Sequence, residues 1–480
     1  MDQKEFQELK KDFERVALYR EIPSDHLTPI TAYYALAKKG SCLLESAVVS
    51  KTESDLEAQQ GRHSYIGIDP MASLKSKGRQ IEIKIGGQIE RFDGDPYQAL
   101  RDLQKKMRTA VVHPLPVFTG GATGFIAYDA IRVKEKIPDR HADLLNLPDF
   151  FFQFYRSSLS FDHKTGKVIL STIAQDYEAG MRELDRLDSE LKQSLSEKPL
   201  PQMSGNKGHI DIQSDLSDEQ YGAIVEKAKE YVRAGDIFQM VPSRTFSVKI
   251  KASPFQVYRA LRQRSPAPFL FFFDLDGYAI AGASPEKVIS VNERIIESTP
   301  IAGTRPKGSC PKELLNDPKE IAEHVMLVDL ARNDVGAVSK PGSVQVVEYK
   351  QVHQFSHVMH IVSRVAGELD EPYDALDAFK ASFPAGTLTG APKVRAMELI
   401  DELETKRRGL YGGAILGLDA KGNLTSCIAI RTTLIKDGVA YVRAGGGIVL
   451  DSVPQTEAEE TRFKANTVLD ALRIAEGSVL

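Results

Sequence analysis

The chain has 480 residues, of which 42% are hydrophobic, and its formal net charge is −4. This length predicts two domains or one large domain with additions, and the near balance of charge gives no general attraction to nucleic acid or to an acidic membrane. No apolar run of about 18 residues suggests a spanning helix, and the charged N-terminus is unlike a signal peptide. The three cysteines, Cys42, Cys310 and Cys427, form no CxxC pair, so neither zinc nor disulfides are indicated. We therefore expect a soluble, cytoplasmic protein.

The first part of the chain reads as a helix followed by many strands. Residues 4–19 carry apolar side chains near helical spacing, which predicts an amphipathic helix. Residues 41–170 consist mostly of short apolar or alternating segments separated by Gly and Pro, which is typical of strands. A charged helix is predicted over residues 177–195. We therefore expect a sheet-rich first domain over residues 1–195.

A stretch rich in Pro, Gly, Ser and charge, residues 196–215, is the best candidate for a linker. After it, Ser217 and Gln220 form a capping box that predicts a helix start, and Gly235 is placed to end that helix. The rest of the chain alternates strands and helices, so a second, mixed α/β domain is expected over residues 216–480. Its main predicted helices cover 318–332, 374–381, 393–402 and 456–475, and its main predicted strands cover 237–248, 268–275, 424–435 and 439–450.

Paired glutamates occur on two of these predicted helices. Asp317 and Pro318 predict a helix start, and Glu320 is placed to complete a capping box. Glu320 and Glu323 share one helix face because they are three residues apart. An isolated pair of this kind is more often a cap with a solvated acid than a functional site.

The last predicted helix repeats the pattern, because Glu457, Glu460 and Lys464 lie on one face. A lone helix of this kind is ordinarily a surface helix with salt bridges. Four carboxylates gathered in one cleft would instead repel one another and require a divalent cation, and oxygen ligands alone favour Mg²⁺. The sequence does not show whether the two helices meet.

Two glycine-containing segments are candidates for binding an anion through backbone N–H groups. Gly445, Gly446 and Gly447 follow a predicted strand, and residues 384–393 form a second Gly/Thr segment. A plain glycine turn explains either segment equally well. Neither matches the spacing of a P-loop, so a nucleoside triphosphate is not favoured.

An arginine and a histidine stand in apolar surroundings further along. Strand alternation places Arg431 on the same face as Cys427 and Thr433, where an arginine needs a carboxylate partner from protein or ligand. His360, the last histidine of HQFSHVMHI, has apolar neighbours. It suits a general base with a tuned pKa, but it suits a satisfied core histidine equally well.

Taken in order, a series of segments resembles the chorismate-utilising enzymes and, within that family, the component I subunits of anthranilate synthases. The segments are GDIFQMVPSR, GASPE, PIAGTRPKG, KEIAEHVMLVDLARND, HVMH, PAGTLTGAPK, YGGAI, CIAIRT and AGGGIVLDSVPQTEAEET. Each alone is weak, but the ordered set is very specific and covers most of the chain. The resemblance implies an α/β (α+β) fold in which large mixed and antiparallel sheets pack as a sandwich flanked by helices.

The resemblance also implies a lyase reaction. Ammonia adds to the ring of chorismate while the ring hydroxyl leaves, and loss of pyruvate and a ring proton then gives anthranilate, the first step of tryptophan biosynthesis. This chemistry needs a cation for the ring carboxylate and an arginine for the other carboxylate. It also needs an acid for the departing hydroxyl and a base for the elimination.

The matching motifs assign these roles residue by residue. Glu286 matches the acid that protonates the leaving hydroxyl, and His360 matches the group that assists pyruvate elimination. The other catalytic matches are Gln239 and Thr304. Four glutamates match the Mg²⁺ site, Glu323 and Glu460 as direct ligands and Glu320 and Glu457 as supporting carboxylates. The substrate contacts implied are Gly303, Thr304, Thr387, Tyr411, Arg431, Gly445, Gly446, Gly447 and Lys464.

Two positions choose among members of the family. Water-adding members carry a lysine where this chain has Gln239, and glutamine cannot deprotonate water, so it suits ammonia. Residues 298–308, STPIAGTRPKG, read as a loop in which Gly303 and Thr304 contact the ring. Aminodeoxychorismate synthases carry a nucleophilic lysine at the position of Ala302, and its absence favours direct amination.

The first domain resembles the family's regulatory domain, with tryptophan as feedback inhibitor. The residues matched to the inhibitor pocket are Leu44, Glu45, Ser46, Pro268, Phe269, Leu270 and Cys427. None of the cysteines lies in a glutaminase-like elbow, so the resemblance implies a separate glutamine amidotransferase subunit that supplies ammonia within a hetero-oligomer. The alternatives are an aminodeoxyisochorismate synthase, an aminodeoxychorismate synthase component I, or a tryptophan- or chorismate-binding sensor without turnover.

Overall fold

The computed structural model describes most of the chain. The described residues are 1–480 without 24, 26, 47–61, 113–117, 198–199, 204–207, 307, 355–357 and 478–480. For Thr304, Pro306 and Val358 only the backbone is described. Within these ranges, no helix is long and apolar enough to cross a membrane.

The first region of the chain is rich in strands, as predicted. Its elements are α1 (Gln3–Leu9), β1 (Arg15–Ile22), α2 (Pro29–Leu36), β2 (Cys42–Glu45), β3 (His63–Lys77), β4 (Gln80–Ile85), β5 (Gln88–Asp93), α4 (Pro96–Lys106), β6 (Thr109–Ala110), β7 (Ala122–Ile126), the 3₁₀ helix η1 (Tyr128–Val133), β8 (Phe150–Asp162), β9 (Lys167–Ala174) and α5 (Tyr177–Glu197). The charged helix predicted over residues 177–195 is confirmed as α5. The helix predicted over residues 4–19 is wrong beyond Leu9, because Val16 and Leu18 pack into the core from β1, whose backbone pairs with β9.

The second region alternates strands and helices, again as predicted. Its elements are β10 (Ile212–Ser214), α6 (Asp218–Ala234), β11 (Gln239–Met240), β12 (Ser243–Lys249), α7 (Pro254–Arg264), β13 (Phe269–Leu275), β14 (Tyr278–Ser284), β15 (Lys287–Asn292), β16 (Ile295–Ser298), β17 (Ile301–Pro306), α8 (Pro311–Leu315), α9 (Pro318–Gly336), β18 (Gln345–Gln354), β19 (Val358–Glu368), α10 (Ala375–Ser382), the 3₁₀ helix η2 (Gly386–Leu388), β20 (Gly390–Ala391), α11 (Lys393–Leu403), β21 (Ala414–Leu418), β22 (Leu424–Ile428), β23 (Thr432–Lys436), β24 (Val439–Gly445) and α12 (Pro454–Glu476). The capping box of Ser217 and Gln220 is present, and Gly235 ends α6 with a φ of 81°.

Two segments differ from the sequence predictions. The supposed loop at 298–308 is largely strand, because β17 pairs with β19 and has an irregularity between Ala302 and Arg305. The strand predicted over residues 424–435 is broken after Ile428, and Arg431 adopts a φ of 49° before β23 begins. Strand alternation therefore does not set the direction of Arg431.

Strands from both regions belong to one hydrogen-bonded network. Apart from the parallel pair β1–β6, the pairings between the described strands are antiparallel. Two of them join the regions directly, because β2 pairs with β13 and β7 pairs with β21. The division into domains at residues 196–215 stays a prediction, and β10 at the end of that stretch already pairs with β12.

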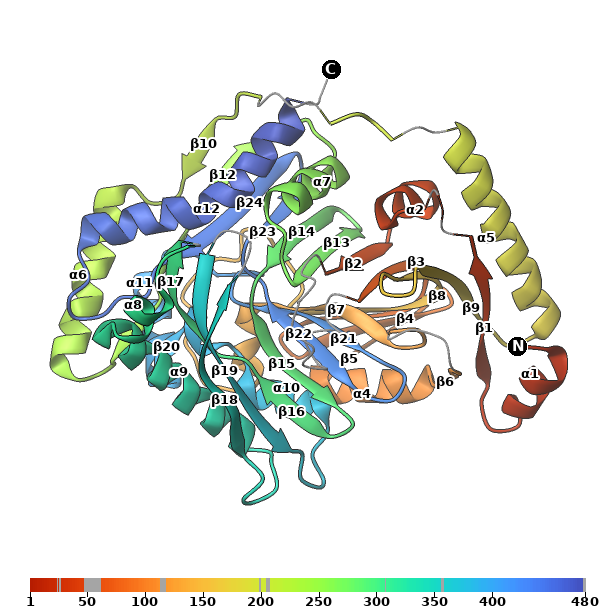
Figure 1. Ribbon diagram of the computed structural model, residues 1–480, viewed down its shortest axis with the longest axis horizontal. Coiled ribbons are helices and arrows are strands. Elements are labelled where there is room, and N and C mark those ends of the chain that lie inside the picture. The colour runs from red at the N-terminus through yellow and green to blue at the C-terminus, as the bar shows by residue number, and fades with distance from the viewer. Residues whose placement is uncertain are drawn as a thin grey trace.

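Three hydrophobic clusters form most of the core. A middle cluster contains side chains of facing strands, including Phe125, Phe151, Phe271, Ile415 and Cys427. The helices α2, α5, α7 and α12 contribute to a second cluster, and α4, α9 and α10 contribute to a third. Figure 1 shows the strands running through the middle of the molecule with helices around them. This arrangement is a sheet sandwich flanked by helices, as the sequence predicts.

Candidate active site

The paired glutamates of α9 and α12 lie within electrostatic reach of one another. Burial raises the pKa of Glu323 on α9, and the charges of Glu320 and of Glu460 on α12 raise it further. Burial likewise raises the pKa of Glu457, and Glu460 adds to this rise. The fold therefore brings together the two acidic pairs, which the sequence alone could not place.

Glu320 differs from the sequence prediction. Asp317 caps α9 by accepting from the backbone N–H groups of Lys319 and Glu320, but the Glu320 side chain does not complete a capping box. Instead Arg305 Nη1 on β17 donates to Glu320 Oε1 over 2.9 Å, since a charge-assisted bond outweighs a neutral one. Gly303 approaches the same carboxylate: with a φ of 67°, it would place a Cβ 3.1 Å from Glu320 Oε2.

The donor set of these glutamates fits Mg²⁺. Among the described residues no three His, Cys, Asp or Glu side chains are grouped closely enough to hold a metal ion by themselves. Glu457 Oε2 is nevertheless buried and has no hydrogen-bond partner within the described part of the chain. Mg²⁺ keeps several of its waters and needs only one or two carboxylates as direct ligands. The positive charge of the ion would also relieve the repulsion between the glutamates. The chemistry of the donors thus suits a hydrated Mg²⁺ ion.

The glycines after β24 lie against these acids. A Cβ on Gly446 would stand 2.8 Å from Glu457 Oε2, so a larger residue here would displace that carboxylate. Lys464 Nζ donates to the Gly445 carbonyl over 3.0 Å and pairs with Glu460 over 2.7 Å. The Gly446 N–H donates to the Tyr221 hydroxyl over 3.2 Å, so this amide already has a partner.

Gln239 reaches the same glycine segment from β11. A Cβ on Gly447 would stand 2.4 Å from Gln239 Nε2, and Gln239 is buried. On the other side of the segment, the Tyr411 hydroxyl would lie 3.0 Å from a Cβ on Gly445. Gln239 and Tyr411 therefore both lie against the glycine segment.

Glu286 lies between β14 and β15 and is partly buried. Burial raises the pKa of its carboxyl group to about 7, against the opposing effects of Thr387 and Lys464. Thr387 Oγ1 donates to Glu286 Oε1 over 2.9 Å. A carboxyl group with this pKa holds its proton for a large part of the time near neutral pH, which is the property of a general acid.

The pKa of His360 on β19 is shifted in the opposite direction. Burial lowers its pKa, and the charge of Arg431 lowers it further, while the Gly303 carbonyl opposes this change. His360 Nδ1 lies 2.8 Å from the Gly303 carbonyl oxygen. Because a carbonyl only accepts, Nδ1 carries the proton, and the lone pair of the neutral ring is on Nε2. The ring is therefore set up as a base.

Arg431 is largely desolvated, and burial lowers its pKa. Within the described ranges, no hydrogen bond or ion pair involves its guanidinium group. Its backbone carbonyl accepts from the Ala283 N–H over 3.1 Å, which holds the residue beside β14. The carboxylate partner expected for this arginine is therefore not supplied by the described protein, and a carboxylate-bearing ligand would complete it.

The residues matched to an inhibitor pocket lie on adjoining strands. Antiparallel pairing of β2 with β13 places Glu45 opposite Leu270. Leu44, Phe269 and Cys427 pack with the middle core cluster. Pro268 directly precedes β13, and Ser46 directly follows β2. The set therefore lies on adjoining strands but is divided between two core clusters, because Leu270 packs in the cluster on the other face.

The Glu45 carboxylate is already engaged within the protein. It accepts from the Tyr258 hydroxyl over 2.6 Å and from Arg262 Nε over 2.9 Å. The side chain of Thr304 lies outside the described residues, so its predicted contact with the ring is untested.

Sequence reasoning missed several residues that support the site. Arg305 holds Glu320, Tyr221 holds the glycine segment, and a buried pair, Glu404 and Arg408, lies behind Tyr411. No local signal distinguishes them, because a Glu and an Arg four residues apart ordinarily indicate a surface pair.

Known proteins resemble this chain in sequence and in fold. Residues 52–470 match the family described as chorismate binding enzyme. Anthranilate synthase component 1 from Acetivibrio thermocellus is 39% identical, over 97% of each chain, and that from Pseudomonas aeruginosa is 40% identical over 100% of each chain. The crystal structure of anthranilate synthase component I from Streptococcus pneumoniae matches with a TM-score of 0.78 and 37% identity, over 94% of this chain and 99% of that chain. The chain therefore belongs to the chorismate-binding enzymes, in the lyase group of anthranilate synthase component 1 subunits.

Proposed function

We propose that this chain converts chorismate and ammonia to anthranilate and pyruvate, with Mg²⁺ as cofactor. The observation that carries this proposal is the opposite perturbation of two groups. Burial raises the pKa of Glu286 to about 7, whereas it lowers the pKa of His360. Such a divergence supports Glu286 as an acid and His360 as a base.

Glu286 acts in the first step. As ammonia adds to the ring, the bond to the ring hydroxyl breaks, and the Glu286 proton leaves with that oxygen as water. Thr387 fixes the carboxyl group for this transfer through its 2.9 Å hydrogen bond. Gln239 lies against the glycine segment and cannot deprotonate water, which favours ammonia as the nucleophile.

His360 acts in the second step. The neutral ring takes the proton from the ring carbon, and the electrons of that bond restore aromaticity as the enolpyruvyl C–O bond breaks. Arg431 and Tyr411 hold the enolpyruvyl carboxylate, since the guanidinium group finds no partner within the described protein. Gly303 keeps the His360 tautomer fixed through its carbonyl oxygen.

Glu323 and Glu460 would hold Mg²⁺, supported by Glu457 and Glu320. When bound, the ion supplies a positive charge for the ring carboxylate, and Lys464 adds to that charge from the same helix face. Glu320 is the weakest member of this set because Arg305 already pairs with it.

Regulation and ammonia supply complete the proposal. We place tryptophan in the pocket bounded by Leu44, Ser46 and Phe269, as a feedback inhibitor. A separate glutamine amidotransferase subunit would supply ammonia, because the relatives are named as component 1 of a synthase. The cytoplasm is the location that the composition predicts.

Product identity tests the proposal against its alternatives. Purified chain is incubated with chorismate, Mg²⁺ and a high concentration of ammonium salt, and products are separated by chromatography with fluorescence detection. Anthranilate as the main product supports the proposal. An accumulating amino-diene would indicate an aminodeoxyisochorismate or aminodeoxychorismate synthase instead, and unchanged chorismate would indicate a binding protein without turnover.

A further inference from the structure

Glu404 and Arg408 form an ion pair that is buried behind the site. The two residues are 3% and 5% exposed. Arg408 Nη2 lies 2.6 Å from Glu404 Oε1, and Arg408 Nε lies 3.0 Å from Glu404 Oε2. A buried pair of this kind is weak evidence for stability, because desolvation offsets most of the attraction. Stability alone therefore does not explain why Arg408 and Glu404 also bond to several neighbouring segments.

Arg408 connects three segments that border the substrate volume. Its Nη1 donates to the Leu388 carbonyl over 2.6 Å, directly after Thr387, the hydrogen-bond partner of Glu286. Its Nη2 donates to the Val241 carbonyl over 2.5 Å, two residues after Gln239. The guanidinium carbon also lies 5.6 Å from the centre of the Tyr411 ring.

Glu404 adds a fourth segment to this cluster. Its Oε1 accepts from the backbone N–H of Ser243 over 2.8 Å and from the Ser243 hydroxyl over 2.7 Å. Its Oε2 accepts from Arg443 Nη2 over 2.6 Å. Arg443 belongs to β24, two residues before Gly445, so the pair also fixes the start of the glycine segment.

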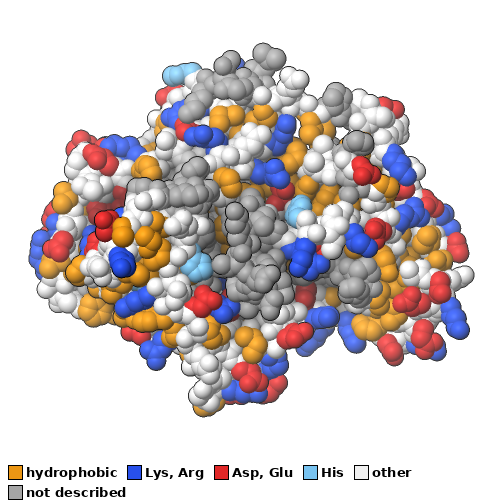
Figure 2. Space-filling view, in the orientation of Figure 1, with side chains coloured by type: hydrophobic (Ala, Val, Ile, Leu, Met, Phe, Trp, Pro, Cys, Tyr) orange, Lys and Arg blue, Asp and Glu red, His pale blue; other side chains and the backbone are white. Residues whose placement is uncertain are grey.

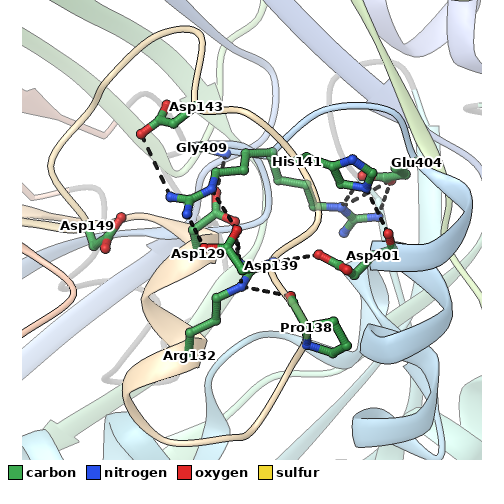
Figure 3. Close-up of polar contacts among 12 residues, drawn as sticks. Asp129, Arg132, Pro138, Asp139, His141, Asp143, Asp149, Asp401, Glu404 and Gly409 are labelled. Atoms are coloured by element: carbon green, nitrogen blue, oxygen red, sulfur yellow. Dashed lines mark hydrogen bonds and ion pairs between the residues drawn. The ribbon is translucent and has the colours of Figure 1, made fainter.

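The outer side of residues 401–409 is held by the first region of the chain. Arg132 donates to Asp401 over 2.7 Å, and the Gly409 N–H donates to Asp129 over 2.7 Å. Figure 3 shows Asp129, Arg132 and Asp139 arranged against Asp401 and Gly409. These hydrogen bonds hold the backbone on both sides of Arg408 in place.

We propose that Arg408 is a positioning residue that holds the segments of Gln239, Thr387 and Tyr411 at fixed distances from one another. This inference rests on the proposed function, because it assigns those segments to the substrate. Arginine is required for the role, since its planar fork donates in several fixed directions at once. Lysine would retain the charge and one or two contacts, but it cannot span the carbonyls of Leu388 and Val241 and the Glu404 carboxylate in the same way.

The test compares Arg408→Lys with Arg101→Lys, because Arg101 is a half-buried arginine with a similar two-pronged pair elsewhere in the chain. Arg101 makes a two-pronged pair with Asp374, at 2.6 and 2.9 Å, and also contacts Asp377. It joins α4 to α10, and its polar partners within the described ranges, Asp374 and Asp377, lie outside the substrate segments. Arg101→Lys is therefore the control for the general cost of losing a guanidinium fork.

Both variants are purified as full chains, and their steady-state kinetics are measured with chorismate, Mg²⁺ and ammonium salt, beside their melting temperatures. We expect Arg408→Lys to lower kcat about 10²-fold, since misplacement of reacting groups by about 1 Å has an effect of that size. The KM for chorismate should rise by a smaller factor than kcat falls, because Arg431 and the acidic residues are untouched even though Arg408 supports Tyr411. Arg101→Lys should keep kcat within about twofold.

Two results would overturn the proposal. One is a kcat for Arg408→Lys within about threefold of the unmodified chain. The other is a loss of activity that merely follows the folded fraction and recovers at lower temperature, which would indicate a structural role only. Failure of the proposed function is a different result, because the unmodified chain and Arg101→Lys would then also make no anthranilate.

Discussion

Replacement of Glu286 by glutamine should have opposite effects on catalysis and on the stability of the fold. Glutamine keeps an oxygen that accepts the hydrogen bond of Thr387, but it carries no transferable proton. We expect kcat to fall by at least about 10²-fold, since general acid catalysis contributes about 10²- to 10⁴-fold. The folded protein, in contrast, should become more stable at neutral pH.

The magnitude follows from the pKa. Its rise from 4.5 to about 7 in the folded state means that folding disfavours the charged carboxylate. At about 1.4 kcal/mol for each pKa unit, this corresponds to about 3 kcal/mol. The penalty is absent below the ordinary pKa of 4.5. It grows as the pH rises to about 7 and then stays constant, because the folded protein binds this proton more tightly than the unfolded chain does.

The assay is urea denaturation of the unmodified chain and of Glu286→Gln at a series of pH values, beside anthranilate formation at one fixed pH. The difference in unfolding free energy should shift in favour of the variant by about 3 kcal/mol between about pH 4.5 and about pH 8. A difference that does not change with pH would refute the assigned pKa. A variant that retains kcat within about tenfold would refute the role of the acid.

Two further predictions concern substrate and inhibitor. Arg431→Gln should raise the KM for chorismate at least about tenfold while leaving the melting temperature unchanged or higher, because the guanidinium group loses no partner within the described protein and burial already disfavours its charge. A lowered melting temperature with an unchanged KM would place the role of Arg431 in the fold instead. Ser46→Phe should keep its activity but lose inhibition by tryptophan, measured as anthranilate formation against tryptophan concentration, and retained inhibition would count against the pocket beside β2.

Local signals in the sequence predicted individual helices well. The capping box at Ser217 and the proline at the start of α9 act within a few residues, so both can be read without knowing the fold. The two wrong predictions concern features that such local signals do not report. The chain leaves the predicted helix after Leu9 because β9 lies beside β1, and Arg431 leaves its predicted strand at a backbone turn, which no periodicity encodes.

The site shows the same limit. The resemblance assigned Glu286, His360 and Arg431 to one site, which stays a prediction, although the charge of Arg431 acts on His360. The sequence could not show which partners Glu320 and Gly446 already have. The role of Arg408 could not be predicted from the sequence, for a physical reason. Its role depends on carbonyl groups of Val241 and Leu388, and backbone acceptors carry no residue identity that a motif can record.

The exposed surface adds little to these conclusions. Figure 2 shows hydrophobic, acidic and basic side chains interspersed over the visible face, which agrees with a net charge near zero for a chain of this length. The functional argument therefore depends on the interior groups and on their protonation.

The assignment of Glu286 as the acid and His360 as the base is tested most directly by the product that His360→Gln releases. The measurement is chromatography coupled to mass spectrometry after incubation with chorismate, Mg²⁺ and ammonia. Because glutamine cannot accept the ring proton, we expect amination to continue and an amino-diene that still carries the enolpyruvyl group to accumulate. Release of anthranilate at the rate of the unmodified chain would contradict the assignment of His360 as the base.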